Sequence, residues 1–285
     1  MSATLPPSTT YCALQMAEVA CLPVAGGQVA VFSRRSPDKA EDGSVHNEDA
    51  FAVLPVGEAG GVLAVADGCG GQFNGLEAAQ RAIQALADCV LRNDNPELLR
   101  SAILDGFEAA AKSVAELGHG AATTLIAVEL GGEMIRTYHV GDSQAMLVGS
   151  RGKVKLQTRA HSPVGYAIEA GMLSESDALG HADRHIVSNV LGCSELHIDI
   201  GLPRPFSPRD TLVIGSDGLY DNLTQAEIAE LVRKGTLEAA AEATRAAVAK
   251  RMSGAEATAP CKPDDLTFLI YRANPARPPQ VPDAS

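Results

Sequence analysis

The sequence predicts an α+β fold: a four-layer α-β-β-α sandwich in which two antiparallel sheets are flanked by helix pairs. Strand-like apolar runs follow one another directly and are separated by short turns that contain glycine, as in antiparallel hairpins. Segments with helical periodicity occur in two adjacent pairs and not after every strand, so a βαβ series is not indicated. With 285 residues and 46% hydrophobic content, the chain is long and apolar enough to bury such a core.

The first strands are expected at residues 28–33, 50–55 and 61–66. The last two runs are separated by a turn that contains Gly57 and Gly60, which predicts a hairpin, and the second run ends in Asp67 and Gly68. Residues 1–25 are weakly patterned. We therefore treat them as an N-terminal extension of uncertain order and begin the domain at residue 26.

A helix pair is expected after the hairpin. Apolar residues recur at helical spacing between residues 76 and 90. A second helix is predicted from Asn95 as N-cap, with Pro96 at the first helical position, to a stop at Gly118. Because the connection between them is short, the two helices should be antiparallel neighbours.

The second half of the chain returns to strands. Runs at residues 124–130, 134–140, 145–148 and 154–158 predict one continuous meander, and a loop-rich stretch over residues 159–192 follows. A strand at 211–215, a helix capped by Thr224, an alanine-rich helix at 236–252 and a last strand at 266–271 complete a domain that ends at residue 272. The tail, residues 273–285, holds four prolines and is expected to be disordered.

Composition argues against several functional classes. The net charge is −12 and no run of Lys or Arg is long enough to follow a phosphate backbone, so nucleic acid is not an expected partner. No apolar run reaches the ~18 residues of a membrane span. The six cysteines form no CxxC pair and the N-terminus lacks a secretory signal pattern, which favours reduced thiols in a cytoplasmic protein. We expect a monomer.

Acidic residues gather at the ends of the predicted strands. Five acidic positions fall at the ends of separate strands or in their flanking turns: Glu48 with Asp49, Asp67, Asp142, Asp217 with Asp221, and Asp264 with Asp265. Strand ends can converge from distant sequence positions, and carboxylates that meet repel each other unless cations neutralise them. Oxygen ligands without His or Cys favour Mg²⁺ or Mn²⁺ over Zn²⁺.

Each acidic position also has a purely structural interpretation, since Asp-Gly pairs are common turns. Gly68, Gly70 and Gly71 between a strand and a helix offer a different function, a phosphate-cradling loop. However, neither GxGxxG nor GxxxxGK is present, and Asp67 at the strand end would repel a phosphate unless a metal intervened. Nucleotide binding is therefore the weaker hypothesis.

Five ordered motifs resemble those of the Mg²⁺/Mn²⁺-dependent protein Ser/Thr phosphatases (PP2C-like), in their bacterial branch. The stretch after residue 170 is also similar to the flap of that branch. The matching motifs are His46-Asn47-Glu48-Asp49-Ala50, Ala64-Val65-Ala66-Asp67-Gly68, Val140-Gly141-Asp142-Ser143, Ser216-Asp217-Gly218-Leu219-Tyr220-Asp221 and Asp264-Asp265-Leu266-Thr267.

The resemblance implies an enzyme that hydrolyses phosphoserine and phosphothreonine in targets of a Ser/Thr kinase, by a metal-activated water and without a covalent intermediate. By the same match, Asp67 bridges two Mn²⁺ or Mg²⁺ ions. Asp217 and Asp264 would complete the coordination of one ion, and Glu48 with the Gly68 carbonyl would complete that of the other. Asp49 would orient water in the outer shell of ligands, and Asp142 with Asp221 would hold a third, weaker ion. The residues implied in catalysis are Asp67, Asp217, Asp264 and Asp49.

Three departures from the family pattern each remove an arginine. Ser44 stands where the phosphate-clamping Arg is expected, Gln144 ends the third motif, and Asn189 replaces the Arg of the flap. An Arg fork grips phosphate bidentately, so its loss should weaken substrate binding. Replacement cations could come from a few residues, each of which is more ordinarily surface: Arg34, Arg35, His46, Arg184 and His185. Cys69 is not expected to be catalytic, and Asp265 for the usual Asn could add charge around the metals.

Two other functions stay open. The missing arginines motivate a regulatory module that keeps the fold and metals without turnover, and they are equally compatible with a phosphatase for a small metabolite. Mn²⁺ binding without hydrolysis would identify the first, and a panel of phosphopeptides and metabolites the second.

Overall fold

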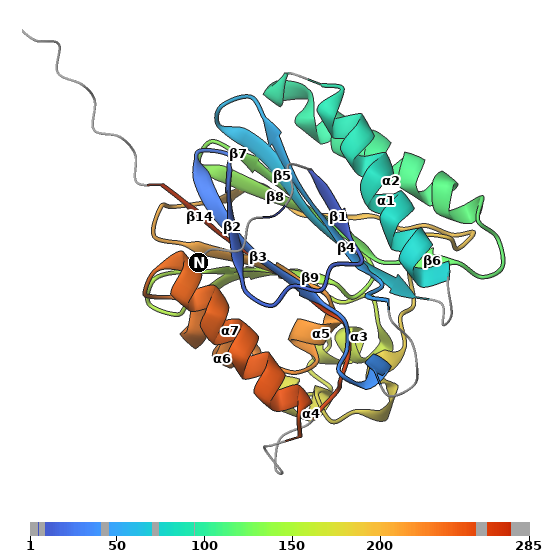
Figure 1. Ribbon diagram of the computed structural model, residues 1–285, viewed down its shortest axis with the longest axis vertical. Helices are drawn as coiled ribbons and strands as arrows, with labels where there is room; N and C mark the ends of the chain where they lie inside the picture. The colour runs from blue at the N-terminus through green and yellow to red at the C-terminus, as the bar shows by residue number, and fades with distance from the viewer. Residues whose placement is uncertain are drawn as a thin grey trace, which may run out of the picture.

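The computed structural model describes residue 5 and residues 9–40, 46–69, 74–93, 95–254 and 261–274. Two antiparallel sheets lie face to face, with one pair of helices on each outer surface (Figure 1). The expected four-layer α-β-β-α sandwich is confirmed. The first sheet has the order β1-β4-β5-β7-β8-β11, with β6 beside β5 and β12 beside β8, and the second has the order β10-β9-β13-β14-β3-β2.

The strands of the first sheet are β1 (Thr10–Cys12), β4 (Asp49–Val56), β5 (Gly60–Cys69), β6 (Ala122–Thr123), β7 (Leu125–Gly131), β8 (Met134–Val140), β11 (Asp199–Ile200) and β12 (Arg204–Pro205). Those of the second are β2 (Ala20–Val24), β3 (Gly27–Arg34), β9 (Gln144–Val148), β10 (Val154–Gln157), β13 (Thr211–Gly215) and β14 (Leu266–Ala273). Helices α1 (Asn74–Leu91) and α2 (Leu99–Ala115) cover the first sheet, and α6 (Gln225–Val232) and α7 (Leu237–Met252) cover the second. Short helices α3 (Pro163–Glu169), α4 (Glu175–Ala178) and α5 (Asp217–Tyr220) lie in the connections, with 3₁₀ turns at Asp38–Ala40, Pro96–Leu98 and Ala182–His185.

The central strands are apolar on both faces because both faces are covered. In β4, Phe51 and Val53 point to the core between the sheets, whereas Ala52 and Leu54 alternate with them and pack under α1 and α2. The small side chains of β4 and β5 on the helix side allow α1 to pack closely against the sheet. The core thus divides into one cluster that includes the space between the sheets and one under the first helix pair.

Local capping chemistry fixes the helix starts. Thr224 and Glu227 form a capping box at the start of α6, as the predicted cap at Thr224 requires. Asn95 does accept a hydrogen bond from the Glu97 N–H, but it caps the 3₁₀ turn that leads into α2 and not α2 itself. The predicted loop at 159–192 contains α3 and α4, each begun by a serine N-cap.

The prediction of one continuous meander is wrong. β7 and β8 form a hairpin in the first sheet, but β9 and β10 belong to the second. The chain crosses between sheets at Gly141, which has φ +105° and where a Cβ would lie 2.6 Å from the Thr124 side chain. Apolar alternation predicts strands but not which sheet a strand joins, and here the glycine permits the change of direction.

The segment before residue 26 also contributes to the fold. β1 pairs with β4 and β2 pairs with β3. Each sheet therefore gains an edge strand from residues that were expected to form an N-terminal extension of uncertain order. β14 runs to Ala273, one residue beyond the expected domain end, and residues 275–285 of the expected tail lie outside the described residues.

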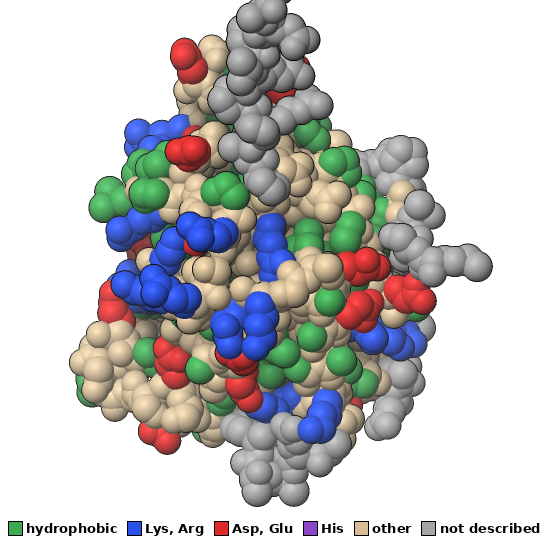
Figure 2. Space-filling model, turned by 90° about the vertical axis from the view of Figure 1, so that its left-hand side faces the viewer, with side chains coloured by type: hydrophobic (Ala, Val, Ile, Leu, Met, Phe, Trp, Pro, Cys, Tyr) green, Lys and Arg blue, Asp and Glu red, His purple; other side chains and the backbone are tan. Residues whose placement is uncertain are grey.

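Surface and chain chemistry add three observations. Figure 2 shows a face on which a group of Lys and Arg side chains has Asp and Glu side chains at its margins, unlike the continuous basic stripe of nucleic-acid surfaces. Over the part of the chain that the structure describes, no helix has both the length and the apolar character needed to cross a bilayer. All six cysteines are free thiols.

Candidate metal centre

The predicted carboxylates converge at one end of the sandwich, where strands of both sheets end. Asp49 and Asp67 are direct cross-strand partners at the open end of the β4–β5 hairpin. Asp142 lies in the crossing between β8 and β9, Asp217 and Asp221 bracket α5 after β13, and Asp264 immediately precedes β14. We call Glu48, Asp49, Asp67, Asp142, Asp217, Asp221 and Asp264 the carboxylate cluster.

Mutual repulsion confirms how close these groups lie. Burial, followed by the charges of Asp217, Asp49, Asp264 and Asp142, raises the pKa of Asp67 well above its ordinary value. The same two causes, burial first and Asp217 second, raise the pKa of Asp264 to about 7 and that of Asp221 to about 6. Carboxylates held together at this cost indicate a cation site.

Within the part of the chain that the structure describes, three buried carboxylate oxygens have no hydrogen-bond partner: Asp49 Oδ1, Asp142 Oδ1 and Asp217 Oδ1. Buried polar atoms in proteins nearly always have a partner, so orphaned oxygens in one cluster require an explanation. A hard divalent cation fits them because every donor in the cluster is an oxygen, the ligand set of Mg²⁺ and Mn²⁺.

Close packing against Gly75 brings the Gly68 carbonyl and the Glu48 carboxylate near each other. Gly75, in the first turn of α1, contacts Gly68 so tightly that a Cβ on Gly75 would lie 2.8 Å from the Gly68 oxygen and 2.5 Å from Glu48 Oε1. Only glycine fits at this contact. The start of α1 therefore fixes the two groups expected to complete the second ion.

Hydrogen bonds hold Asp49 and the loop before it. Asp49 is fully buried, and its Oδ2 accepts a 2.8 Å bond from the Ser216 hydroxyl. Asp265 accepts from the N–H groups of Ser36 at 2.7 Å and Glu48 at 2.6 Å. The expected addition of charge by Asp265 is thus accompanied by an anchoring role, because its carboxylate ties the Glu48 backbone to β14.

Two lysines that the sequence reasoning missed enter this centre. The Lys262 ammonium contacts Asp217, and it lies 2.7 Å from Asp221 Oδ2 and 3.2 Å from Asp264 Oδ2. Lys39 bonds Glu48 at 2.6 Å and Asp265 at 2.7 Å. Burial lowers the pKa of Lys262, but the charges of the three aspartates outweigh it and the net shift is upward. The only sequence signal was that Lys262 lies two positions before Asp264.

Two of the three residues that stand in place of the expected arginines make hydrogen bonds within the fold. Ser44 lies outside the described residues. Gln144 accepts a 2.8 Å bond from Gln157. Asn189 donates to His161 Nδ1 at 2.8 Å and to the His197 carbonyl at 2.6 Å, so it holds the flap to the domain.

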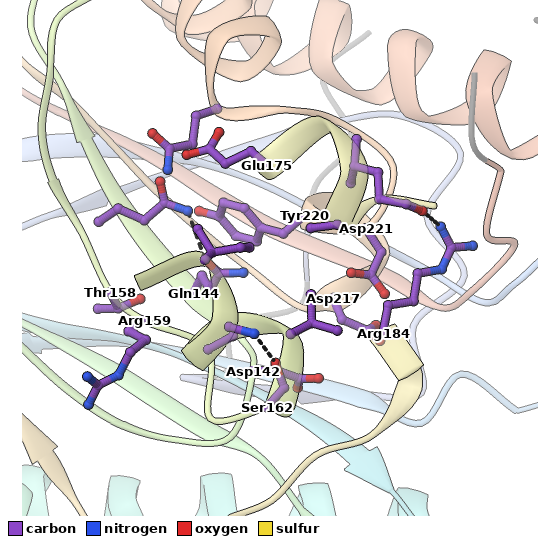
Figure 3. Close-up of a pocket in the computed structure, with 18 of the residues that line it drawn as sticks. Asp142, Gln144, Thr158, Arg159, Ser162, Glu175, Arg184, Asp217, Tyr220 and Asp221 are labelled. Carbon is purple, nitrogen blue, oxygen red and sulfur yellow. Dashed lines mark hydrogen bonds between the residues drawn. The ribbon is translucent and has the colours of Figure 1, made fainter. Parts of the chain in front are cut away.

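Of the candidate replacement cations, Arg184 lies nearest the cluster. It borders a pocket of about 320 Å³ that Asp142, Asp217 and Asp221 also line (Figure 3). Its guanidinium donates to the backbone carbonyls of Leu179 and Cys261, which occupies part of the fork. Arg34 and Arg35 line a separate cavity that reaches Asp264, His46 is exposed, and His185 ends a 3₁₀ turn in the flap. None of these replaces a bidentate clamp in the structure as described.

A second group with metal-ligand spacing lies outside the cluster: His139, His161 and Asp199, whose ligand atoms lie within 4.8 Å of one another. His161 Nδ1 accepts hydrogen bonds from the Gly141 N–H and the Asn189 amide, so its proton is on Nε2, which faces Asp199 at 3.2 Å. His139 Nε2 lies 2.8 Å from the Arg159 carbonyl and must carry a proton to bond it. Both nitrogens that face Asp199 are protonated, and the group is therefore a hydrogen-bonded network.

Known proteins are similar to this chain in sequence and in fold. A family model for protein phosphatase 2C matches residues 38–253. Serine/threonine phosphatase stp of Listeria monocytogenes serovar 1/2a is 30% identical over 208 residues, which cover 69% of this chain and 82% of that protein. Serine/threonine protein phosphatase PstP of Mycobacterium tuberculosis is 29% identical over 180 residues, or 60% of this chain and 34% of that protein.

Solved structures show the same fold. The S. agalactiae serine/threonine phosphatase superposes with a TM-score of 0.74 at 25% identity, covering 87% of this chain and 100% of that one. The catalytic domain of PstP in complex with two manganese ions superposes with a TM-score of 0.67 at 24% identity, over 86% of this chain and 96% of that one, a likeness of fold. With the family model matched over most of its length, the chain belongs to the protein phosphatase 2C family.

Proposed function

We propose that this chain is a metal-dependent protein phosphatase that hydrolyses phosphoserine and phosphothreonine with a metal-activated water and no covalent intermediate. The observation that carries the proposal is the carboxylate cluster, in which three buried oxygens have no hydrogen-bond partner among the described residues. Membership of the protein phosphatase 2C family and the Ser/Thr phosphatase relatives support the reaction and the substrate class.

Within this proposal, Asp67, Asp217 and Asp264 would hold one Mn²⁺ or Mg²⁺ ion. Asp67, Glu48 and the Gly68 carbonyl would hold a second, and Asp142 with Asp221 could take a third. Such ions supply Lewis acidity and a hydroxide-like nucleophile near neutral pH. Support comes from the convergence of all these groups at one end of the two sheets.

The protein's own part is positioning. Ser216 fixes the Asp49 carboxylate, which leaves Asp49 Oδ1 to hold a water at the edge of the centre. The Gly68–Gly75 contact and the Asp265 anchor fix the groups on the opposite side. Because Ser44 stands in place of the clamping arginine, and Gln144 and Asn189 replace the two other arginines of the family pattern, we expect the substrate phosphate to be held mainly by the ions.

The substrates would be products of a Ser/Thr kinase, and we place the enzyme in the cytoplasm as a monomer. The six free thiols support a reducing compartment.

Phosphate release from an aryl phosphate and from phosphopeptides, with Mn²⁺ or with EDTA, tests the proposal. We expect activity only with Mn²⁺, and its loss by at least a thousandfold in Asp67→Asn and Asp217→Asn. Asp210→Asn is a matched control, because Asp210 is a buried carboxylate in a lysine pair far from the cluster. Activity that persists in EDTA would contradict a metal-dependent reaction.

The two lysines in the centre and the missing arginines favour one alternative, a metal-binding regulatory module of the same fold. It predicts a Mn²⁺ isotherm without hydrolysis of any phosphopeptide. Turnover of metabolites but not phosphopeptides would indicate the small-molecule phosphatase instead.

A further inference from the structure

The Lys262 side chain occupies the centre of one half of the carboxylate cluster. Its ammonium contacts Asp217, Asp221 and Asp264 together, and the side chain is 16% exposed. A lysine on a mobile loop would place its charge in solvent at less entropic cost. Three simultaneous partners therefore indicate a side chain that the fold directs into the site.

The backbone of Lys262 is held by a dedicated clamp. The Asn222 side chain donates to the Lys262 carbonyl at 2.8 Å and accepts from the Lys262 N–H at 3.1 Å. Asn222 itself is fully buried and also donates to the Gly218 carbonyl at 3.0 Å. Pro263 follows and restricts the chain further. The connection before β14 is thus fixed to the turn that carries Asp217 and Asp221.

An ammonium group and a divalent cation compete for the same oxygens. Two positive charges a few ångströms apart repel each other, and an oxygen bonded to the ammonium has fewer lone pairs for a metal. Lys39 makes a similar but separate pair at Glu48 and Asp265, on the other side of the cluster.

We infer that Lys262 is a tethered cation that competes with divalent metal for Asp217, Asp221 and Asp264, and that it thereby sets the metal affinity of this chain. The inference rests on the metal centre of the proposed function. It predicts that Lys262 stabilises the carboxylate cluster when metal is scarce and opposes metal binding when metal is added.

An ordinary structural ion pair would behave differently. A buried pair whose only role is stability loses stability when one partner is removed, whatever the metal concentration. When a competing cation is removed, the protein loses stability in EDTA but binds metal more tightly. The sign of the change in Mn²⁺ affinity therefore separates the two interpretations.

The test is calorimetric titration of the full chain with Mn²⁺, together with melting temperatures in EDTA and in excess Mn²⁺. We expect Lys262→Met to lower the Kd for Mn²⁺ by about tenfold or more, from the removal of one charge near a divalent ion. Its melting temperature should fall in EDTA and recover in Mn²⁺. Lys262→Arg keeps the charge and should retain a Kd close to that of the wild type.

Lys155→Met is the matched control. Lys155 pairs with the buried Asp210 at 2.7 Å, away from the cluster, so its loss should lower stability equally with and without Mn²⁺ and leave the Kd unchanged. Lys262→Gln, which retains hydrogen-bond donors to the aspartates, is titrated in parallel in case the Met variant does not fold without metal.

A Kd for Mn²⁺ that is unchanged or higher in both neutral variants would overturn the inference. The comparison of Kd values for Mn²⁺ does not depend on the result of the hydrolysis assay. A wild-type chain that binds Mn²⁺ without turnover would end the proposed enzymatic function and leave the role of Lys262 to be decided by the titration.

Discussion

Gly75→Ala should weaken metal binding without replacing any proposed ligand. The added methyl would lie 2.5 Å from Glu48 Oε1 and 2.8 Å from the Gly68 carbonyl oxygen. An ordinary contact needs about 3.4 Å, so the carbonyl has to retreat by roughly 0.6 Å and the Glu48 carboxylate by more. Metal–oxygen distances tolerate only about 0.2 Å. The expected displacement is about three times that tolerance.

Both groups that retreat are expected ligands of one ion, so that ion should bind at least about tenfold more weakly, as when the support of a metal ligand is removed. Helix stability should change little at this position. The replacement gains up to about 1 kcal/mol of helix propensity, which offsets part of the steric cost. The assay is a Mn²⁺ titration followed by calorimetry, with thermal melting in EDTA to report on the fold.

Gly106→Ala provides the control. Gly106 is also a helical glycine in tight contact, since a Cβ there would lie 2.7 Å from Leu86 Cδ1 and 3.0 Å from Leu86 Cα, but it packs α2 against α1. Overpacking should cost about 1–3 kcal/mol of stability and leave Mn²⁺ affinity unchanged. If Gly75→Ala binds Mn²⁺ as tightly as the wild type, the carbonyl and Glu48 are not ligands and the assignment of that half of the centre is refuted.

Three further predictions concern positions with one clear physical cause each. Burial, followed by the charge of His161, lowers the pKa of His139 to about 4, whereas its value in the unfolded chain is about 6.5. Between these two pH values the unfolded state binds more protons than the folded state. The free energy of unfolding should therefore fall by about 2 kcal/mol from pH 7 to pH 5. In urea unfolding, the His139→Gln variant should lose less stability than the wild type over that pH range. An equal loss in both proteins would contradict the assignment of the pH dependence to His139. Asn222→Ala leaves three backbone groups without partners and should cost about 2–4 kcal/mol by the same assay, whereas a cost under 1 kcal/mol would show the clamp to be dispensable. Thr224→Ala removes a cap and should cost about 1 kcal/mol with Mn²⁺ affinity unchanged, as calorimetry would check.

The cross-strand position of Asp49 and Asp67 could be predicted from the sequence. The turn between β4 and β5 is short, and Val56 pairs with Gly60. Counting outward residue by residue from this turn brings Asp49 opposite Asp67. The hairpin and the helix pair after it follow from equally local patterns, which is why these elements were predicted with nearly their observed bounds.

The crossing at Gly141 could not be predicted in the same way. Hydrophobic alternation is identical whether β9 continues the first sheet or begins the second. The choice depends on how Asp142 and β13 pack, which involves residues about seventy positions apart. For the same reason Lys39 and Lys262 were missed, since both lie outside regular strands and helices and no periodicity encodes where their side chains point.

The distribution of positive charge explains how this chain differs from the family pattern. Arginine is replaced at each of the three positions where the resemblance expects one, and the described two, Gln144 and Asn189, hold the fold instead. At the site, Lys39 and Lys262 bind carboxylates, and Arg184 in the adjoining pocket donates to backbone carbonyls. Positive charge thus acts on the carboxylates that are proposed to hold metal and not on the substrate phosphate. A catalyst built this way should need more Mn²⁺ for half-maximal activity and show a weaker grip on the phosphate, so that substrate recognition depends on groups outside the phosphate itself.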